Sequence, residues 1–530
     1  MRSRALALFA ILGMLFTSAA GAGTFVSLTA GADESAEAVD VQVVNQSLQA
    51  ITLDYRLAGF ELEEVTIGGA TYHTVTLGEE SNLLEAGFPE LPTINRSVII
   101  PDDMEMQIRV IRSSYQEFSG IDVVPSKGSL TRDMDPASVP YTFGDLYEQA
   151  GFFPSELAQI GEPYILRDYR GAVVTINPVQ YDPSTHTLRV YDYVEIELVP
   201  VGPGAVNVIQ RADGVPADVH PEFDKLYTNH FINYAMGGFG RYAPIDEVGE
   251  MIVIAYDSYA SAVEPLVEWK NQMGVPTTLL LLSEVGSSAN QIKSYVQNYY
   301  DTHDLAFVLL VGDLPQIPSL SNAGAPADPM YALVAGSDNY PDIFIGRISA
   351  QDLGAVALQV TKFVEYESLP QAAGWYQKGV GIASAEGAGI GDDGEADWVH
   401  IDYIRDDLLG FTYDEVDQLY AIYGASASDV AAAVNAGRSI INYCGHGSST
   451  SWSTTGFNNN HVNALTNDNK LPVIVSVACV NGAFQYGSTC FAEAWMQASH
   501  SGEPTGAVGI YASTVNMQWA PPMSAQDETA

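Results

Sequence analysis

The sequence predicts a chain of two folded parts, a β-rich domain followed by a larger α/β domain with a mostly parallel sheet flanked by helices. Three observations carry this prediction: alternating polar and apolar residues in the first part, buried strands alternating with helices in the second, and a loose stretch between them. We place the β-rich domain at residues 23–206, a linker at 207–241 and the α/β domain at 242–530.

Residue alternation marks the strands of the β-rich domain. In "YVEIELVPV", Tyr193 to Val201, apolar side chains alternate with glutamates, and "ITLDY", Ile51 to Tyr55, alternates likewise. A period of two residues is typical of a half-buried strand. Turn-forming pieces such as "YDPSTHT" at 181–187 separate these runs, which indicates antiparallel pairing.

Continuous apolar runs mark the strands of the α/β domain. "MIVIAYD", Met251 to Asp257, is apolar through its length, and Ser261 to Met273 has helical spacing. Strands that are apolar on both faces indicate a mostly parallel sheet covered on both sides, in which functional side chains collect at the carboxyl ends of the strands. Further strands are expected within residues 305–313, 342–347, 378–387, 438–447, 471–482 and 505–514.

Charge composition restricts the function. The 530 residues carry 65 acidic and 22 basic side chains, a net charge of −43. Nucleic-acid binding needs clustered lysine and arginine, so a nucleic-acid partner is excluded. The acidic balance is compatible with an exported protein or with carboxylate-bound calcium.

The N-terminus has the pattern of a secretory signal peptide over residues 1–22. Arg2 and Arg4 precede the apolar run Ala5 to Phe16, and Ala20-Gly21-Ala22 fits an A-x-A cleavage site. The run is too short to span a bilayer, and no later stretch reads as a transmembrane segment. We therefore expect a secreted protein, extracellular or attached to the cell surface.

Three cysteines, Cys444, Cys479 and Cys490, leave at least one thiol free. A disulfide-dependent secreted chain of this length would carry more cysteines and an even number. A Cys444–Cys490 bridge remains open at this point.

A histidine and a cysteine each follow a predicted strand. His446 stands between two glycines in "NYCGHGSS", and Cys479 precedes Asn-Gly in "LPVIVSVACVNG". On neighbouring strands the imidazole could accept the thiol proton and later protonate a leaving amine, while the backbone N–H groups of Gly447 and Cys479 stabilise an oxyanion. The alternative is that each is structural, since a lone buried cysteine is usually a small core residue.

Four stretches resemble the gingipain-type cysteine peptidases: "GHGS…W", "LTNDNKLPVIVSVACVNGAF", "CFAEAWMQA" and "PTGAVGIYASTVNMQWAPPMSAQDE". The resemblance runs from Arg241 to the C-terminus and implies a caspase-like α/β fold. The β-rich half, with "AGFPELP" at Ala86 to Pro92, resembles the gingipain pro-domain, which implies an inhibitor and folding aid. Relatives continue beyond the end of this sequence, so we expect the peptidase domain to be C-terminally truncated.

The resemblance also assigns roles to single residues. It implies that Cys479 is the nucleophile, His446 the general base and Glu386 in "SAEG" the acid that orients the histidine. Asp397 in "DDGEADW" matches the acid at the base of the arginine-binding S1 pocket, and Trp519 in "QWAPPM" matches the aromatic residue over the bound side chain. A carboxylate can accept two parallel guanidinium hydrogen bonds, and an indole face attracts the cation.

Met517 departs from the family pattern, because relatives carry a polar residue near the pocket at that position. If that side chain helps to fix the arginine, selectivity should be weaker here.

Calcium is the expected metal, and we expect no organic cofactor. The segment "AGSDNYPD", Ala335 to Asp342, spaces oxygen ligands two residues apart, and its counterpart in the family binds calcium. The predicted ligands are Asp313, Ala335, Asp338, Tyr340 and Asp342, with Glu395 and His400 matching positions near a family calcium site.

These observations predict a secreted cysteine endopeptidase zymogen that cuts protein or peptide substrates after arginine and is inhibited by its own pro-domain. "GFGRYAP" places Arg241 in a glycine-rich linker that a protease can reach, and the resemblance implies a processing site between Arg241 and Tyr242. Two alternatives remain, a non-catalytic calcium-binding surface or adhesion protein with the peptidase fold, and a peptidase with another P1 preference.

Overall fold

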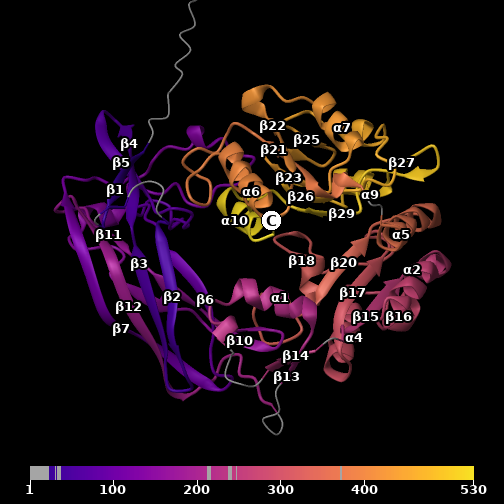
Figure 1. Cartoon of the computed structure of the whole chain (residues 1–530), viewed down its shortest axis with the longest axis horizontal. Helices are drawn as coiled ribbons and strands as arrows, with labels where there is room; N and C mark the ends of the chain where they lie inside the picture. Colours follow the sequence, from indigo (N-terminus) through magenta and orange to yellow (C-terminus); the bar gives the residue numbers. More distant parts are fainter. Residues whose placement is uncertain are drawn as a thin grey trace, which may run out of the picture.

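The computed structural model describes residues 23–29, 31–32, 37–211, 217–236, 242–245, 247–370 and 373–529. The predicted signal peptide and Arg241 lie outside these described residues. In Figure 1 the β-rich domain, in indigo and purple, lies beside an α/β domain that runs from magenta to yellow.

Antiparallel sheets build the β-rich domain, as predicted. Their strands are β1 (Thr24–Ser27), β4 (Gly59–Ile67) and β5 (Ala70–Thr76); β6 (Ile94–Ile99), β10 (Tyr169–Ile176), β8 (Ala158–Ile160) and β9 (Tyr164–Leu166); and β11 (Val179–Asp182), β12 (Thr187–Pro203), β3 (Ile51–Leu57), β2 (Val39–Gln46) and β7 (Met104–Ser119). Val194, Ile196 and Leu198 of β12 are fully buried in the core of this domain, which explains the alternation in the sequence.

The first sheet of the α/β domain is parallel, in the order β16-β15-β17-β20. Its strands are β15 (Glu250–Ala255), β16 (Thr277–Leu281), β17 (Leu305–Val311) and β20 (Phe344–Ile348). Val253 packs with the helices α2 (Ala260–Gln272) and α5 (Leu353–Ser368), and its neighbour Ile252 packs with α4 (Ala289–Thr302). Helices therefore cover both faces of this sheet.

The second sheet is also parallel, in the order β22-β21-β23-β26-β29. Its strands are β21 (Lys378–Ala383), β22 (Glu415–Tyr420), β23 (Ile440–Cys444), β26 (Val473–Val477) and β29 (Gly509–Ala512). Side chains of α7 (Ala427–Ala436) and α9 (Phe491–Gln497) pack with one set of buried strand residues, and those of α6 (Asp397–Phe411) and α10 (Ala520–Asp527) with another. The predicted parallel, helix-flanked architecture is confirmed.

Two features of this domain were not predicted. The parallel strands form two sheets rather than one, and the buried Lys362 of α5 connects them by donating to the carbonyl oxygens of Trp495 and Ala507 at 3.1 and 3.4 Å. Strands β16 and β22 were missed, and both lie at sheet edges; "EVDQLY" of β22 carries polar residues, which an edge tolerates.

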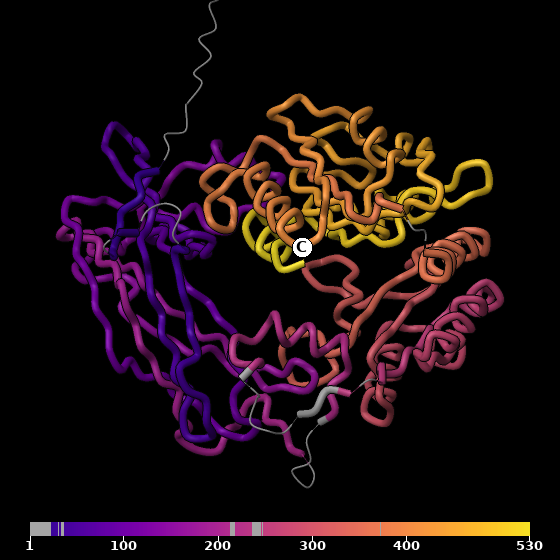
Figure 2. The backbone as a smooth tube through the Cα atoms, in the orientation of Figure 1, coloured from indigo at the N-terminus to yellow at the C-terminus, as the bar shows by residue number. Residues whose placement is uncertain are grey.

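Segment 207–241, which the sequence suggested to be a loose linker, contains packed structure. Helix α1 (Pro221–His230) buries Phe223 and Tyr227 against residues of both domains. Strand β13 (Ala217–Val219) pairs in parallel with β14 (Tyr242–Pro244). Figure 2 shows α1, in magenta, between the two large parts of the molecule. Residues 217–236 are therefore not loose, because aromatic side chains in them reach a buried cluster.

The remaining short elements are α3 (Leu282–Val285), α8 (Asn459–Val462) and the strand pairs β18 (Ser321–Asn322) with β19 (Ala325–Pro326), β24 (Gly447–Ser448) with β25 (Ser451–Trp452), and β27 (Ser499–His500) with β28 (Glu503–Pro504). Within the described residues, the helices are all too short or too polar to cross a membrane.

Candidate active site

The two predicted catalytic residues follow neighbouring strands in matching positions. β23 and β26 are paired in parallel with Cys444 opposite Val477. His446 and Cys479 each lie two residues beyond these partners. Both side chains therefore emerge at the same edge of the sheet, the carboxyl edge at which open α/β sheets bind ligands.

His446 is held by Glu386, which follows β21. The imidazole Nε2 lies 2.6 Å from Glu386 Oε2. An ionised carboxylate only accepts hydrogen bonds, so Nε2 carries the hydrogen and Nδ1 is left to take a proton. The structure thus brings Glu386 to the histidine as the resemblance implied.

Cys479 sits on a strained turn. The next residue, Val480, has φ of +49°, a left-handed backbone that a β-branched side chain rarely adopts. Such strain is found where the surrounding structure fixes a functional side chain. Burial raises the pKa of the Cys479 thiol, and only 4% of the residue is exposed. In this form of the chain Cys479 therefore carries a neutral, covered thiol.

Asn481 joins the histidine loop to the cysteine loop, a role that sequence reasoning missed. Its buried amide donates to the carbonyl oxygens of Ser448 and Ser451 at 2.7 and 3.1 Å, and its Oδ1 accepts from Ser476. At Gly447, an added Cβ would lie 2.7 Å from the Cys479 carbonyl oxygen. Glycine is required there because the two loops are in direct contact.

An arginine of the β-rich domain occupies the predicted S1 pocket. Nη1 of Arg132 donates to both carboxylate oxygens of Asp397 at 2.9 and 3.0 Å, and neither side chain has exposed surface. The Arg132 guanidinium carbon lies 4.5 Å from the centre of the Trp519 ring. The sequence predicted Asp397 and Trp519 for this pocket but gave no indication of Arg132.

The backbone around Arg132 pairs with that of residues 517–519 through a single antiparallel bridge. The N–H of Arg132 donates to the Met517 carbonyl at 2.7 Å, and the N–H of Trp519 donates to the Leu130 carbonyl at 3.0 Å. Thr131 and Gln518 form an antiparallel bridge between these bonds. Pairing of this kind is how extended peptides bind a free sheet edge. Met517 thus contributes a backbone acceptor at the pocket.

Asp397 begins helix α6, and its carboxylate is fixed from two further sides. Ser384 Oγ donates to Oδ2 at 2.6 Å, and the Cys444 thiol lies 3.3 Å from Oδ1. Cys444 Sγ also lies 3.1 Å from Nη2 of Arg132. We expected two guanidinium nitrogens to donate to one carboxylate. Here one nitrogen donates to both oxygens of Asp397, and the second nitrogen contacts the sulfur of Cys444.

A cluster of ionisable groups lies behind the S1 pocket. Asp392, Glu395 and His400 have ligand atoms within 4.8 Å of one another, and Nδ1 of His400 lies 3.4 Å from Asp527 Oδ1. Nε2 of His400 faces Gln526 Oε1 at 3.2 Å and must donate to it, so Nδ1 presents a lone pair to the carboxylates. Glu395 Oε1 is buried and has no hydrogen-bond partner.

The pKa values in this cluster are shifted because it is unfavourable to bury several ionised carboxylates together. Burial, and after it repulsion from the neighbouring carboxylates of Asp392 and Asp393, raises the pKa values of Glu395 and Asp527 well above their usual range. Burial lowers the pKa of His400 to about 4, so the imidazole is neutral. A divalent cation would remove this repulsion, and the oxygen-rich donor set fits one.

The other predicted calcium ligands are not gathered into one carboxylate group. Within the described ranges, Asp313, Asp338 and Asp342 do not meet the spacing of a three-residue metal cluster. Asp313 accepts from Gln351 and from the N–H of Leu314. The Asp342 carboxylate accepts from the backbone of residues 334, 335 and 167, and Asp338 from that of residues 165 and 340. Calcium binding by this loop, with Ala335 and Tyr340, stays a prediction.

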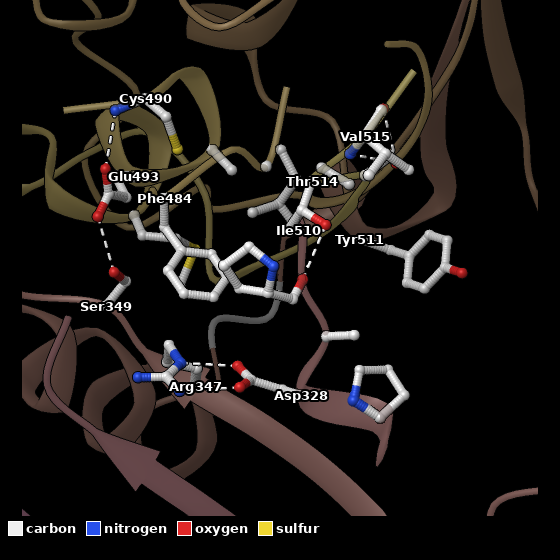
Figure 3. A pocket seen from close by; sticks show the side chains of 18 of the residues that line it. Asp328, Arg347, Ser349, Phe484, Cys490, Glu493, Ile510, Tyr511, Thr514 and Val515 are labelled. Carbon is white, nitrogen blue, oxygen red and sulfur yellow. Dashed lines mark hydrogen bonds and ion pairs between the residues drawn. The ribbon is translucent and has the colours of Figure 1, made fainter. Parts of the chain in front are cut away.

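All three cysteines are free and buried, so the structure does not contain the Cys444–Cys490 bridge. Cys490 lines a separate cavity of about 540 Å³ between the two sheets. Figure 3 shows its charged groups paired with one another, Arg347 with Asp328, and Glu493 with Ser349 and the backbone of Cys490. No charged group there remains available for a ligand among those drawn.

Comparisons with known proteins agree with this geometry. The model of peptidase family C25 matches residues 245–529, and that of the C25 propeptide matches residues 32–209. Gingipain R1 of Porphyromonas gingivalis is 37% identical over 497 residues, which cover 92% of this chain and 49% of the relative. Gingipain R2 of the same organism is 36% identical over 495 residues, covering 92% and 66%. This chain thus spans about half the length of Gingipain R1.

Two solved structures are similar at 40% identity and a TM-score of 0.52. One is the complex of Porphyromonas gingivalis RgpB pro- and mature domains, with 53% of this chain and 67% of that chain covered. The other is the Arg specific cysteine proteinase gingipain R, with 54% and 68% covered. The resemblance noted in the sequence is confirmed.

Proposed function

Because the chain belongs to peptidase family C25, we propose that it is an exported zymogen of a cysteine endopeptidase that cuts after arginine. The observation that carries the proposal is Arg132, an arginine presented by an extended segment that pairs through one antiparallel bridge, and bound as a P1 residue would be. One solved relative is named an Arg specific cysteine proteinase, which agrees with it. Export is proposed from the charged and apolar N-terminal pattern.

The chemistry follows from the loop geometry. His446 Nδ1 accepts the Cys479 proton as the sulfur attacks the peptide carbonyl carbon, and Glu386 stabilises the imidazolium that forms. Backbone N–H groups near Gly447 and Cys479 stabilise the oxyanion. The imidazolium then protonates the leaving amine, and water hydrolyses the thioester to return the thiol and release a carboxylic acid.

Latency is the second part of the proposal. Arg132 fills the S1 pocket and the strand at Leu130–Arg132 covers the substrate-binding edge, so a peptide cannot bind until the β-rich domain moves. Cutting between Arg241 and Tyr242 would break the covalent connection between the two domains. An enzyme with Asp397 in its S1 pocket would prefer this bond because it follows an arginine.

One experiment tests catalysis and processing together. Cys479→Ala should abolish hydrolysis of an arginyl amide and leave the chain uncut at Arg241, whereas the matched variant Cys490→Ala should retain both, because Cys490 caps helix α9 and does not follow a strand as Cys479 does. Turnover and N-terminal sequencing provide the readouts. Hydrolysis by Cys479→Ala, or a chain beginning at Tyr242 in that variant with no other protease present, would contradict the proposal.

We also propose a calcium ion at Asp392, Glu395, His400 and Asp527, supported by the orphaned Glu395 oxygen and the lone pair of His400 Nδ1. Chelation should lower the melting temperature of the chain, and calcium at about 100 times its Kd should restore about 2.7 kcal/mol. Glu395→Gln should remove most of this response, while Glu284→Gln, on the surface of α3, should keep it. Identical melting with and without chelator would count against the site.

A further inference from the structure

The thiol of Cys444 lies at the floor of the arginine pocket, at the end of β23. We propose that Cys444 is a specificity-determining residue, which accepts a hydrogen bond from the second guanidinium nitrogen of the bound arginine. The inference rests on the proposed function, because it treats the pocket filled by Arg132 as the substrate's P1 site.

The hydrogen bonds around Arg132 divide its terminal nitrogens between two acceptors. Nη1 donates to both oxygens of Asp397, so that carboxylate is occupied by one nitrogen. Nη2 lies 3.1 Å from Cys444 Sγ. The guanidinium is planar and its N–H directions are fixed, so Nη2 cannot turn toward Asp397 without breaking the first pair of bonds.

The Cys444 thiol is oriented to serve as this acceptor. Sγ lies 3.3 Å from Asp397 Oδ1, and a carboxylate can only accept, so the S–H points toward Asp397. The sulfur lone pairs are then left for Nη2. Burial raises the pKa of the Cys444 thiol well above its ordinary value, in agreement with a neutral S–H donor.

Position makes this contact rigid. Cys444 ends a strand that is paired on both sides, with β21 and β26, and none of its surface is exposed. Only Gly445 separates it from His446, so the pocket floor and the general base are set by the same strand end. A substrate arginine that reaches the sulfur is therefore in register with the catalytic residues.

The contact should discriminate arginine from lysine. An ammonium that reaches Asp397 has no second nitrogen to direct at the sulfur, whereas a guanidinium loses a buried hydrogen bond if the sulfur is removed. Substitution of Cys444 by an apolar residue should therefore weaken arginine binding selectively.

Binding of agmatine, a small guanidinium-bearing amine, tests this in the whole chain. The background Arg132→Ala with Cys479→Ala empties the pocket and prevents self-cutting, and calorimetry gives the affinity. Cys444→Val, of similar volume but without an acceptor, should bind agmatine about tenfold more weakly or worse. Cys444→Ser, which keeps a polar acceptor, should stay within about threefold of the background, and the matched variant Cys490→Val should be unchanged.

A second readout covers variants that fold poorly. In the processed enzyme, Cys444→Val should lower kcat/KM for an arginyl amide about tenfold more than for the matching lysyl amide, whereas general damage would lower both equally. Equal agmatine affinity in Cys444→Val and the background would overturn the inference.

Asp397→Asn separates failure of this inference from failure of the proposed function. If Asp397→Asn weakens agmatine binding strongly and Cys444→Val does not, the pocket stands and only the role of Cys444 is wrong. If the background binds no agmatine, or binds it equally well after Asp397→Asn, the proposed arginine pocket itself is overturned, and this inference with it.

Discussion

Arg132 and Arg167 belong to the β-rich domain, and the side chains of both contact the α/β domain. The groups that they contact are different. Arg132 meets a side-chain carboxylate, a thiol and an indole face, all buried. Arg167, between β9 and β10, donates to the carbonyl oxygen of Leu305 at 2.6 Å and to the Asp304 carboxylate at 3.1 Å, and Asp304 is 56% exposed.

The surroundings of Arg167 are specific to the folded β-rich domain. The backbone N–H groups at 165 and 167 donate to Asp338 and Asp342, and Tyr164 stacks on Tyr340 with ring centres 3.7 Å apart. A substrate peptide cannot supply this hairpin. The pocket of Arg132, in contrast, holds one side chain and a short extended backbone, which an arginine-containing peptide, the proposed substrate, could supply. Arg132 therefore makes an exchangeable contact, one that a substrate arginine could replace. Arg167 makes an anchoring contact, one that only the folded β-rich domain can make.

Removing the carboxylate partner of each arginine should give the largest difference in the free energy of unfolding. Asp397→Ala leaves the Arg132 cation buried without its counterion, which costs about 3–5 kcal/mol, whereas Asp304→Ala removes a mostly exposed partner worth about 1 kcal/mol or less. Denaturant unfolding of the intact chain, in the Cys479→Ala background, measures both. Equal losses of stability would show that the two contacts are not different in kind.

Removing the arginines themselves should affect latency unequally. In an Arg241→Ala background, which keeps the domains linked, Arg132→Ala should raise hydrolysis of an arginyl amide about 100-fold, since about 3 kcal/mol of contact is lost. Arg167→Ala should raise it about tenfold through loss of hydrogen bonds to a charged donor. Arg112→Ala is the matched control, because Arg112 is exposed and pairs with Glu195 inside its own domain. A larger effect for Arg167→Ala would reverse the roles assigned here.

The smallest expected effect is a pH dependence of the anchoring contact. His220 Nε2 lies 2.7 Å from Asp304 Oδ2, and this hydrogen bond raises the pKa of His220. A raised histidine pKa adds stability that is complete below the unfolded value of 6.5 and is lost as the pH rises through the folded value. The same bond lowers the pKa of Asp304, so the carboxylate is already ionised throughout that range.

The His220–Asp304 contact should therefore weaken by about 1 kcal/mol or less between mildly acidic and mildly alkaline pH, given the exposure of Asp304. His220 Nδ1 also donates to the Glu247 carbonyl oxygen at 2.8 Å, which favours the protonated ring, whereas the nearby Arg167 cation opposes protonation. Denaturant unfolding across this pH range, compared between the parent and His220→Gln, measures the difference. A parent stability that instead rises with pH relative to His220→Gln would refute the assignment.

Much of the architecture followed from the sequence because apolar periodicity is a local property. The runs around Val253 and Ile474 predicted buried parallel strands, and the positions of His446 and Cys479 at strand ends predicted neighbouring loops. The division into two sheets depends on which strands pair, which local patterns do not specify.

The occupant of the pocket could not be predicted from the sequence. Nothing in "SLTRDMD" distinguishes Arg132 from other arginines of the β-rich domain, since its role depends on a partner 265 residues away. Cys444 was considered only as half of a disulfide, because its acceptor role needs the guanidinium to be in place. The ionisable cluster was found only in part, since Asp527 joins Glu395 and His400 from a distant helix.

The parallel pair β13–β14 has a consequence for the order of events in maturation. Tyr242, expected to become the first residue of the cut chain, has its backbone in register with Ala217 of the preceding segment. Breaking the bond before Tyr242 leaves this ladder, the α1 cluster and the Arg132 strand in place. We therefore expect the proposed cut to give first a nicked chain whose two parts are still assembled. Scission and the onset of activity are then separate in time, and the interval between them is set by dissociation.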